Sequence, residues 1–317
     1  MPIIFTIAIQ EVKVLFRERV FFLLLAIFIL MTLASSFIGL VATTTTTSIY
    51  NASVEFLHQA GTDNIPANPL NALPALTNFR NVIVYIFLIG SLLAIVVGHR
   101  SFIRERKSGA LPLLLTRPIL AEKLFFGKVL GISLALFAII SATFIVSVFS
   151  SLLLPFRHLV ASDIERLFLF YALSFFYLLF FALVGLLFAI KTKSESLALF
   201  VPVCIWVGIS FVLPELVSGQ TPTALLNPVT MDQVAPDGTF FALMRTYLGP
   251  LSLGWHYTSF SSQLLNNSLQ ITNAGIGSAL RDNSGKLFIL LIAIGVCLSL
   301  CFYSIRNYTI QEENIYE

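Results

Sequence analysis

Residues 167–190 have the sequence LFLFYALSFFYLLFFALVGLLFAI, an apolar run without a single Asp, Glu, Lys, Arg or His. A helix needs about 20 such residues to cross a hydrocarbon core of about 30 Å. Five further stretches meet this requirement and lack the same five residue types, namely residues 20–42, 81–98, 129–154, 197–213 and 287–305. Core helices of a soluble protein would carry polar faces, which these runs do not have. The sequence therefore predicts an all-α integral membrane protein with six transmembrane helices, the second placed from about residue 80.

The composition supports a membrane protein. Apolar residues make up 57% of the chain and charged residues 11%, whereas soluble domains have about 25% charged residues. The three cysteines (Cys204, Cys297 and Cys301) all fall inside predicted spans, so no disulfide framework is predicted. Cys297 and Cys301 share a helix face, where close helix packing is the favoured interpretation and a metal-binding pair the alternative. The four histidines are scattered, and no metal site is predicted.

The distribution of Lys and Arg predicts the orientation. With both termini in the cytoplasm, the inner segments hold 13 of the 19 Lys and Arg and the outer segments hold 6. The N-in, C-in arrangement is therefore favoured. The apolar run after Arg19 is too long for a cleavable signal, so we expect the first span to remain as an anchor. A net charge of +3 fits loops beside anionic lipid and suggests no nucleic-acid partner.

The segments between the spans have different characters. Residues 43–79 form a predicted outer loop that opens with five threonines and contains prolines, a chemistry that favours turns. Residues 214–286 form a second outer segment, predicted as short helices at the outer interface with Trp255 and Tyr257 as membrane-belt residues. A seventh span in this segment is the competing interpretation. Residues 99–128 form a cytoplasmic segment with seven of the 19 Lys and Arg.

Residues 2–19 precede the first span and predict an amphipathic helix. On a helical wheel one side is polar, with Thr6, Gln10, Lys13 and Arg17, and with Glu11 and Glu18 at its edge. The other side is apolar. This pattern favours a helix lying in the inner interface with its basic side chains toward the head groups. A cytoplasmic continuation of the first span is the alternative.

The sequence argues against several functions. The spans carry none of the charged groups that ion-coupled carriers usually place at mid-membrane. The Walker A pattern fails because Gly127-Lys128 is followed by Val129 and Gly285-Lys286 by Leu287. No catalytic motif is visible, so the chain is not expected to be an enzyme by itself. Any work must then be driven by another polypeptide acting at the cytoplasmic face.

Residues 99–128 are suited to bind such a partner. A charged run, Arg104–Lys107, precedes Gly109 and a cluster of leucines, and Pro112 and Pro118 restrict the backbone. A short helix with an apolar tip and a charged collar could lodge in the groove of a soluble partner. An ordinary positive-inside loop whose leucines dip into the interface explains the residues equally well.

The segment also resembles the signature of ABC-2 type exporter permeases. The resemblance rests on Glu105-Arg106-Lys107-Ser108-Gly109-Ala110-Leu111, on Leu113-Leu114-Leu115-Thr116-Arg117-Pro118 and on Gly127-Lys128 before the third span. Glu11 and Arg17-x-Arg19 are similar to the family's elbow helix, and Asn227-Pro228-Val229 to an element after its fifth span. The most similar subgroup is the permeases of the nitrous-oxide reductase maturation exporter. Lys107, Ala110 and Pro112 depart from the family pattern, so the contact with a partner is expected to differ in detail.

The resemblance implies a half-transporter. Two membrane subunits, identical or sister, would pair and engage two ABC ATPase subunits that bind ATP and Mg²⁺, with no cofactor on this chain. The implied ATPase-coupling residues are Arg104, Glu105, Arg106, Gly109, Leu111, Leu113, Leu114, Leu115, Arg117 and Pro118. The implied elbow residues are Glu11, Lys13, Arg17 and Arg19, and Gly127 and Lys128 begin the third span.

The leading hypothesis is an ATP-driven exporter in a bacterial inner membrane. Its cargo would be a lipid-like molecule, a peptide or antibiotic, or a small metabolite. One alternative is a non-transporting scaffold that transmits force from the ATPase to an outer partner. A less favoured alternative is an ion-coupled secondary transporter.

Overall fold

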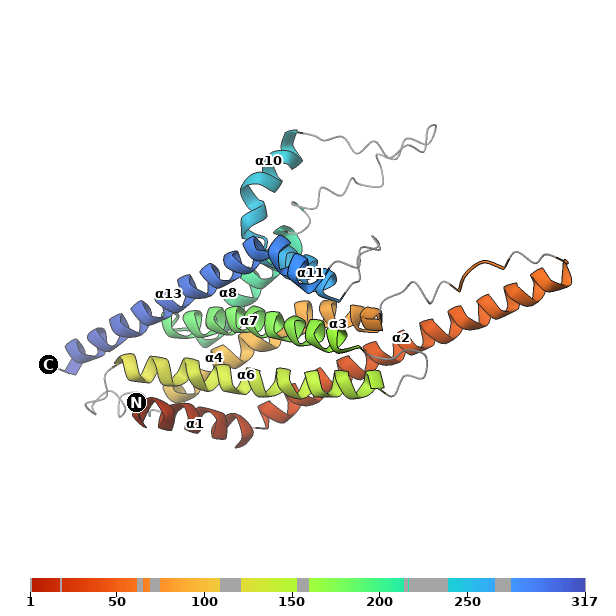
Figure 1. Cartoon of the computed structure of the whole chain (residues 1–317). Coiled ribbons are helices and arrows are strands. Elements are labelled where there is room, and N and C mark those ends of the chain that lie inside the picture. Colours follow the sequence, from red (N-terminus) through yellow and green to blue (C-terminus); the bar gives the residue numbers. More distant parts are fainter. Residues whose placement is uncertain are drawn as a thin grey trace.

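In a computed structural model the chain forms a bundle of long helices (Figure 1). The structure describes residues 2–17, 19–61, 65–68, 75–108, 121–152, 160–213, 216, 239–265 and 275–316, and these contain no strand. The helices, in order, are α1 (Pro2–Arg17), α2 (Val20–Gln59), η2 (Ala75–Phe79), α3 (Arg80–Tyr85), η3 (Ile86–Gly90), α4 (Ser91–Lys107), α6 (Ala121–Leu152), α7 (Ala161–Lys191), α8 (Glu195–Val207), η4 (Gly208–Val212), α10 (Thr239–Leu248), η6 (Gly249–Leu251), α11 (Leu253–Leu264), α12 (Ile276–Asp282) and α13 (Ser284–Tyr316).

Six helical stretches in the described part of the chain are long and apolar enough to cross a membrane. They are Val20–Gln59, Leu76–Lys107, Glu122–Leu152, Ala161–Lys191, Glu195–Val212 and Ser284–Asn307. Each one contains one of the six predicted spans, apart from a residue or two at the end of the third and fifth, which confirms an all-helical protein with six membrane-length helices. Both termini lie at the same end of the bundle, the end at which α4 stops and α6 begins (Figure 1). We call this the hairpin end.

The prediction that turn chemistry begins at residue 43 is wrong for residues 43–59, because α2 continues to Gln59. The threonine hydroxyls are satisfied inside the helix, where Thr43 donates to the Gly39 carbonyl and Thr47 to the Thr43 carbonyl, both at 2.9 Å. Such a bond to the carbonyl one turn back lets a threonine sit in a helix without an unpaired hydroxyl. As a result α2 is about 60 Å long at 1.5 Å per residue.

The middle of the bundle is α7, which packs against α4, α6, α8, α11 and α13. The tightest approach is to α4, at two glycines that face each other's backbone. A Cβ on Gly98 would lie 1.8 Å from the Ala182 carbonyl oxygen, and a Cβ on Gly185 would lie 2.2 Å from the Ile95 carbonyl oxygen. Small residues of this kind allow two membrane helices to pack backbone against backbone.

Two π-helical turns interrupt the spans, η3 before α4 and η4 after α8. A π turn displaces backbone hydrogen bonds, and a nearby hydroxyl can satisfy the carbonyls that it releases. Ser91 does so beside η3, because its Oγ donates to the carbonyl oxygens of Phe87 and Leu88. The indole Nε1 of Trp206, on α8, donates to the same Oγ at 2.7 Å. One side-chain bond therefore ties α8 to the irregular turn of the second span.

We expect Trp206→Phe to lower the free energy of unfolding by about 1 kcal/mol, since it removes one part-buried hydrogen bond and keeps most of the apolar surface. Thermal unfolding in detergent measures the change. In a Ser91→Ala background the same substitution should cost clearly less. An equal cost in both backgrounds would mean that the indole acts by packing alone.

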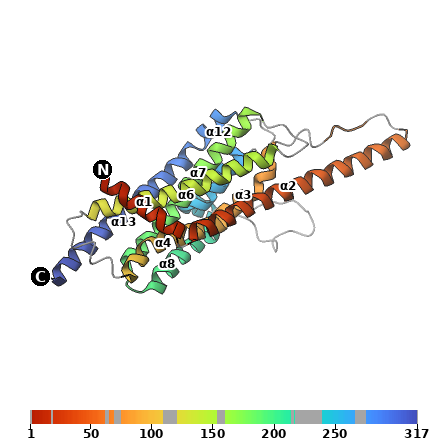
Figure 2. The ribbon, with the colours of Figure 1, turned by 90° about the horizontal axis from the view of Figure 1, so that it is seen from below.

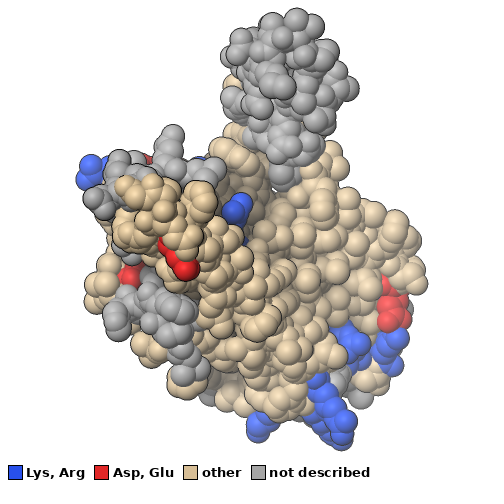
Figure 3. Space-filling view, turned by 90° about the vertical axis from the view of Figure 1, so that its right-hand side faces the viewer, with Lys and Arg blue, Asp and Glu red and all other residues tan. Residues whose placement is uncertain are grey.

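The helices between residues 239 and 282 (α10, η6, α11 and α12) agree with the prediction of short helices in this segment. No described helix among them is long enough to be the seventh span that was the alternative. The belt role predicted for Tyr257 is wrong. Its ring is buried and stacks on that of Tyr177 in α7, with centroids 4.2 Å apart, and its hydroxyl lies 2.9 Å from Ser174 Oγ. Figure 3 shows the side of the molecule toward which α2 projects, and most of the described residues on it are uncharged, apart from small groups of Lys and Arg.

Candidate functional site

The candidate site lies at the hairpin end, where the predicted coupling segment joins the bundle. Residues 99–107 are the last turns of α4 and residues 121–128 the first turns of α6, so both flanks of the segment are helical extensions of spans. Residues 109–120 lie outside the described residues, and with them seven of the predicted coupling residues: Gly109, Leu111, Leu113, Leu114, Leu115, Arg117 and Pro118.

Four consecutive residues end α4, and each one bonds to a different helix. Successive positions on an α-helix point about 100° apart, so a run of four covers the whole circumference. Arg104 reaches back to the N-terminal helix, where its Nη2 donates to Glu11 Oε1 of α1 at 2.9 Å. We call Arg104, Glu105, Arg106 and Lys107 the α4 hub.

Glu105 bonds to the start of α6. Its Oε1 lies 2.7 Å from Lys128 Nζ, and the Lys128 side chain is fully buried. The same ammonium donates to the Ser101 carbonyl at 2.7 Å and lies 3.7 Å from Glu11 Oε2. A buried ammonium needs nearby carboxylates and acceptors to offset its lost hydration, and this cluster supplies them from α1 and α4.

The last two hub residues reach α7 and α8. The Arg106 guanidinium donates to the carbonyls of Ala189, Thr192 and Lys193, where α7 ends. The final carbonyls of a helix have no partner within it and attract a cation. Lys107 Nζ lies 2.8 Å from Glu195 Oε2, in the first turn of α8, although both side chains are at least half exposed.

The helix α1 is seated on α6 by two glycines. A Cβ on Gly127 would lie 2.6 Å from Ile7 Cβ, and a Cβ on Gly131 would lie 2.6 Å from Glu11 Cβ. Because these glycines are four residues apart they face the same way, so α1 can lie directly on the α6 backbone. This close packing places the Glu11 carboxylate against Lys128 and Arg104.

A family model described as an ABC-2 family transporter protein matches residues 5–307. This match covers nearly the whole chain. The chain belongs to the ABC-2 transporter family. No curated protein matches it significantly. The family and the six membrane-length helices together make it a transmembrane permease of the ABC transporter type. The α4 hub, Lys128 and Glu11 are thus part of an ABC-2 membrane domain.

In this ABC-2 permease the predicted elbow residues differ in their burial. Glu11 was expected at the edge of a polar face, but it is 3% exposed and belongs to the face of α1 that packs on α6. Lys13, Arg17 and Arg19 are exposed. Arg19 has a left-handed backbone conformation (φ 60°), and there the chain turns from α1 into α2.

The sequence identified most members of the cluster but not their partners. Arg104, Glu105, Arg106 and Lys128 were selected for their motif, and Glu11 as an elbow residue. Ser101, Thr192 and Glu195 were missed, because a serine carbonyl or a helix end carries no motif. Glu195 did have a detectable signal, since an acidic residue just before a predicted span, here residues 197–213, favours a role at the start of that helix.

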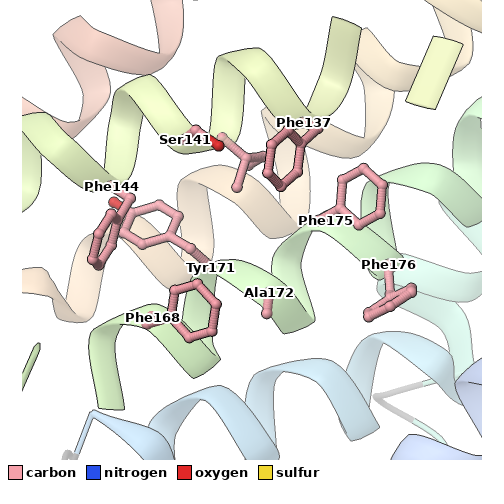
Figure 4. Close-up of a pocket in the computed structure, with 9 residues that line it drawn as sticks. Phe137, Ser141, Phe144, Phe168, Tyr171, Ala172, Phe175 and Phe176 are labelled. Atoms are coloured by element: carbon pink, nitrogen blue, oxygen red, sulfur yellow. The ribbon is translucent and has the colours of Figure 1, made fainter. Parts of the chain in front are cut away.

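A separate apolar groove lies between α6 and α7. It has a volume of about 280 Å³, and Figure 4 shows the aromatic rings that line it. Four of its residues come from α6 (Phe137, Ile140, Ser141 and Phe144) and five from α7 (Phe168, Tyr171, Ala172, Phe175 and Phe176). This lining suits hydrocarbon and offers no charge to an ionic ligand.

Proposed function

We propose that this permease is the membrane subunit of an ATP-driven exporter and is moved by a separate ABC ATPase. The ATPase would bind the coupling segment, residues 104–116, with Leu113, Leu114 and Leu115 as the buried contact. ATP and Mg²⁺ would bind the ATPase alone. Two permease subunits would pair, and the cargo would pass between them near the first, second and fifth spans. The complex would lie in a bacterial inner membrane, as the resemblance to the nitrous-oxide reductase maturation permeases suggests. The distribution of Lys and Arg supports both termini in the cytoplasm.

The observation that carries this proposal is the α4 hub. A partner that displaces residues 109–120 pulls directly on the ends of α4 and α6. Through Arg104 and Glu105 that displacement reaches α1 and Lys128, and through Arg106 and Lys107 it reaches α7 and α8. Charged side chains bonded in this way make the hairpin end one mechanical unit. A push at one point would then shift several spans at once between two arrangements.

Under this proposal Glu105 acts inside the permease. It is part-buried and bonded to Lys128, whereas the resemblance gave it the role of the charged contact on the ATPase. The leucines remain the residues for that contact, so the docking and the transmission of movement are carried by different parts of the segment. An interfacial α1 would be part of the transmitting unit, because its Glu11 bonds to both α4 and α6.

The test uses the permease co-expressed with a candidate ABC ATPase subunit of the same organism and reconstituted into liposomes. Leu113→Asp combined with Leu114→Asp should lower the amount of ATPase that co-purifies with the permease at least tenfold, since two charges would be placed in an apolar contact. A matched control is Leu251→Asp, an exposed leucine on η6, which should leave the complex intact. If the double variant retains the ATPase at the level of the control, the leucines do not form the contact. Full transport by the permease without any ATPase would contradict the proposal itself.

The force-transmitting scaffold remains the second candidate, because α2 runs far beyond the bundle (Figure 1). Such a helix could carry movement to an outer protein. Cargo-stimulated ATP hydrolysis in liposomes would favour export. Hydrolysis that responds only to an added outer protein would favour the scaffold.

A further inference from the structure

The helix α11 and the serine before it carry polar side chains along one side. At 100° per residue, five positions fall within about 100° of the helix circumference. They are Ser252, Trp255, His256, Ser259 and Gln263. The opposite side of α11 packs against α7, where Tyr257 stacks on Tyr177. We call the five residues the polar stripe of α11.

The polar stripe faces the beginning of α13. Lys286 Nζ donates to Ser259 Oγ at 2.7 Å and lies 5.1 Å from the centre of the Trp255 ring, and Asn283 Nδ2 donates to Gln263 Oε1. Figures 1 and 2 both show α13 running from the hairpin end toward the opposite end of the bundle. Lys286 directly precedes the predicted span 287–305. The stripe therefore meets α13 at the level of the lipid head groups.

Lys286 has an unusual position for a cation. It is the third residue of α13, and a positive charge in the first turn of a helix is disfavoured by the helix dipole. Neither Asp282, which is exposed, nor any other described carboxylate forms an ion pair with its ammonium. An acid would stabilise the fold at this position, so the lysine points to a ligand that brings the negative charge.

Two further side chains supply polar atoms that have no partner in the described part of the chain. His256 is 8% exposed and Ser252 is fully buried, yet both ring nitrogens of His256 and the Ser252 Oγ lack a hydrogen bond. Buried polar groups are nearly always bonded. Both residues belong to the beginning of α11, a helix of 12 residues whose first N–H groups have no acceptor within the helix. These groups can all serve an oxyanion.

The two basic side chains lie close enough to influence each other. Burial and, to a smaller degree, the Lys286 ammonium lower the pKa of His256, whereas the nearby carbonyls of Gly249 and Pro250 raise it. These carbonyls form no hydrogen bond with the ring. An anion beside both basic groups would favour their charged forms. Phosphate suits the site because its several oxygens can accept from an ammonium, an imidazole and a hydroxyl together.

We infer that Lys286 and the polar stripe of α11 bind the phosphate of an anionic phospholipid. Lys286 supplies the charge, and His256 and Ser252 donate hydrogen bonds. A lipid is the source of the phosphate because the site lies at the start of a membrane span, beside Leu251, which is 59% exposed and can contact a lipid chain. The inference goes beyond the proposed function, since it requires neither an ATPase nor a cargo.

Native mass spectrometry of the purified full chain tests the inference. The probes are phosphatidylglycerol and phosphatidylcholine with identical acyl chains, which differ in net charge. The wild type should prefer phosphatidylglycerol, and Lys286→Gln should lower its affinity for this lipid about tenfold, because one charge-assisted hydrogen bond is lost. The matched control is Arg281→Gln, which removes an exposed charge from the neighbouring helix α12 and should change the affinity less than about twofold.

A second variant separates lipid binding from folding. Ser252→Ala should leave the melting temperature of the lipid-free protein unchanged, because the Ser252 hydroxyl has no bond to lose. It should still lower the affinity for phosphatidylglycerol about fivefold. Equal affinity for the two lipids, equal losses in Lys286→Gln and Arg281→Gln, or no loss in Ser252→Ala would each overturn the inference.

Inorganic phosphate distinguishes a lipid site from a site for the free ion. Phosphatidylglycerol should raise the melting temperature of the wild type more than that of Lys286→Gln, and inorganic phosphate should raise neither. If inorganic phosphate stabilises the wild type as much as phosphatidylglycerol does, the assignment to a membrane lipid is wrong. Since these assays contain no ATPase, their outcomes leave the test of the leucine contact unaffected.

Discussion

Replacing Lys128 by Met should lower the free energy of unfolding by about 3–5 kcal/mol, the usual cost of removing one partner from a buried ion pair. The Lys128 side chain is fully buried and bonds to Glu105, Ser101 and Glu11. Its loss leaves the Glu105 carboxylate without its ion-pair partner and removes the second cation beside Glu11, which keeps Arg104. Thermal unfolding in detergent, followed by size-exclusion chromatography, measures the change. In the reconstituted complex, the coupling of ATP hydrolysis to transport should fall with it.

The charge-exchange variant shows whether the pair itself matters. Glu105→Lys combined with Lys128→Glu keeps one charge of each sign and should recover part of the stability lost by either single variant. A gain of this kind is the coupling that a double-mutant cycle measures. If Glu105 instead contacts the ATPase directly, the exchange variant would bind the ATPase no better than the single variant Glu105→Lys. Lys123→Met, on the same helix but not fully buried, should have little effect and serves as the control.

The second large effect is expected for Gly98→Ala, which should destabilise the protein by about 3 kcal/mol or more. The added methyl group would lie 1.8 Å from the Ala182 carbonyl oxygen, so α4 and α7 must separate. Overpacking usually costs about 1–3 kcal/mol, and here the obstacle is backbone, which cannot rotate away as a side chain can. Gly185→Ala meets the Ile95 carbonyl oxygen at 2.2 Å and should behave similarly.

Gly295→Ala is the matched control for these variants. Gly295 lies inside the long helix α13, and a Cβ there would meet nothing within 4 Å. Alanine favours a helix by up to about 1 kcal/mol relative to glycine, so this variant should be neutral or slightly more stable. A Gly98→Ala variant that unfolds at the same temperature as Gly295→Ala would contradict the close packing of α4 on α7.

The interior of the bundle could not be predicted from sequence. Glu11 and Arg104 are 93 positions apart, and nothing in either segment points to the other. The sequence predicted Glu11 as an elbow residue at the edge of a polar helix side, and Arg104 as an ATPase-coupling residue. Both residues instead bond to each other because Gly127 and Gly131 let α1 lie on α6. Tyr257 had the chemistry of a belt residue, yet it is buried against Tyr177, because α11 packs onto α7.

The sequence by itself determined that this is a helical membrane protein with six membrane-length helices, and its hydropathy decided this locally. A run of about 20 residues without charge is stable in lipid as a helix whatever its neighbours are. Only the tertiary structure decided how far α2 extends and which helices the α4 hub joins. Those features depend on hydrogen bonds and close contacts between segments far apart in the chain, and the side-chain pattern of one segment does not encode the position of another.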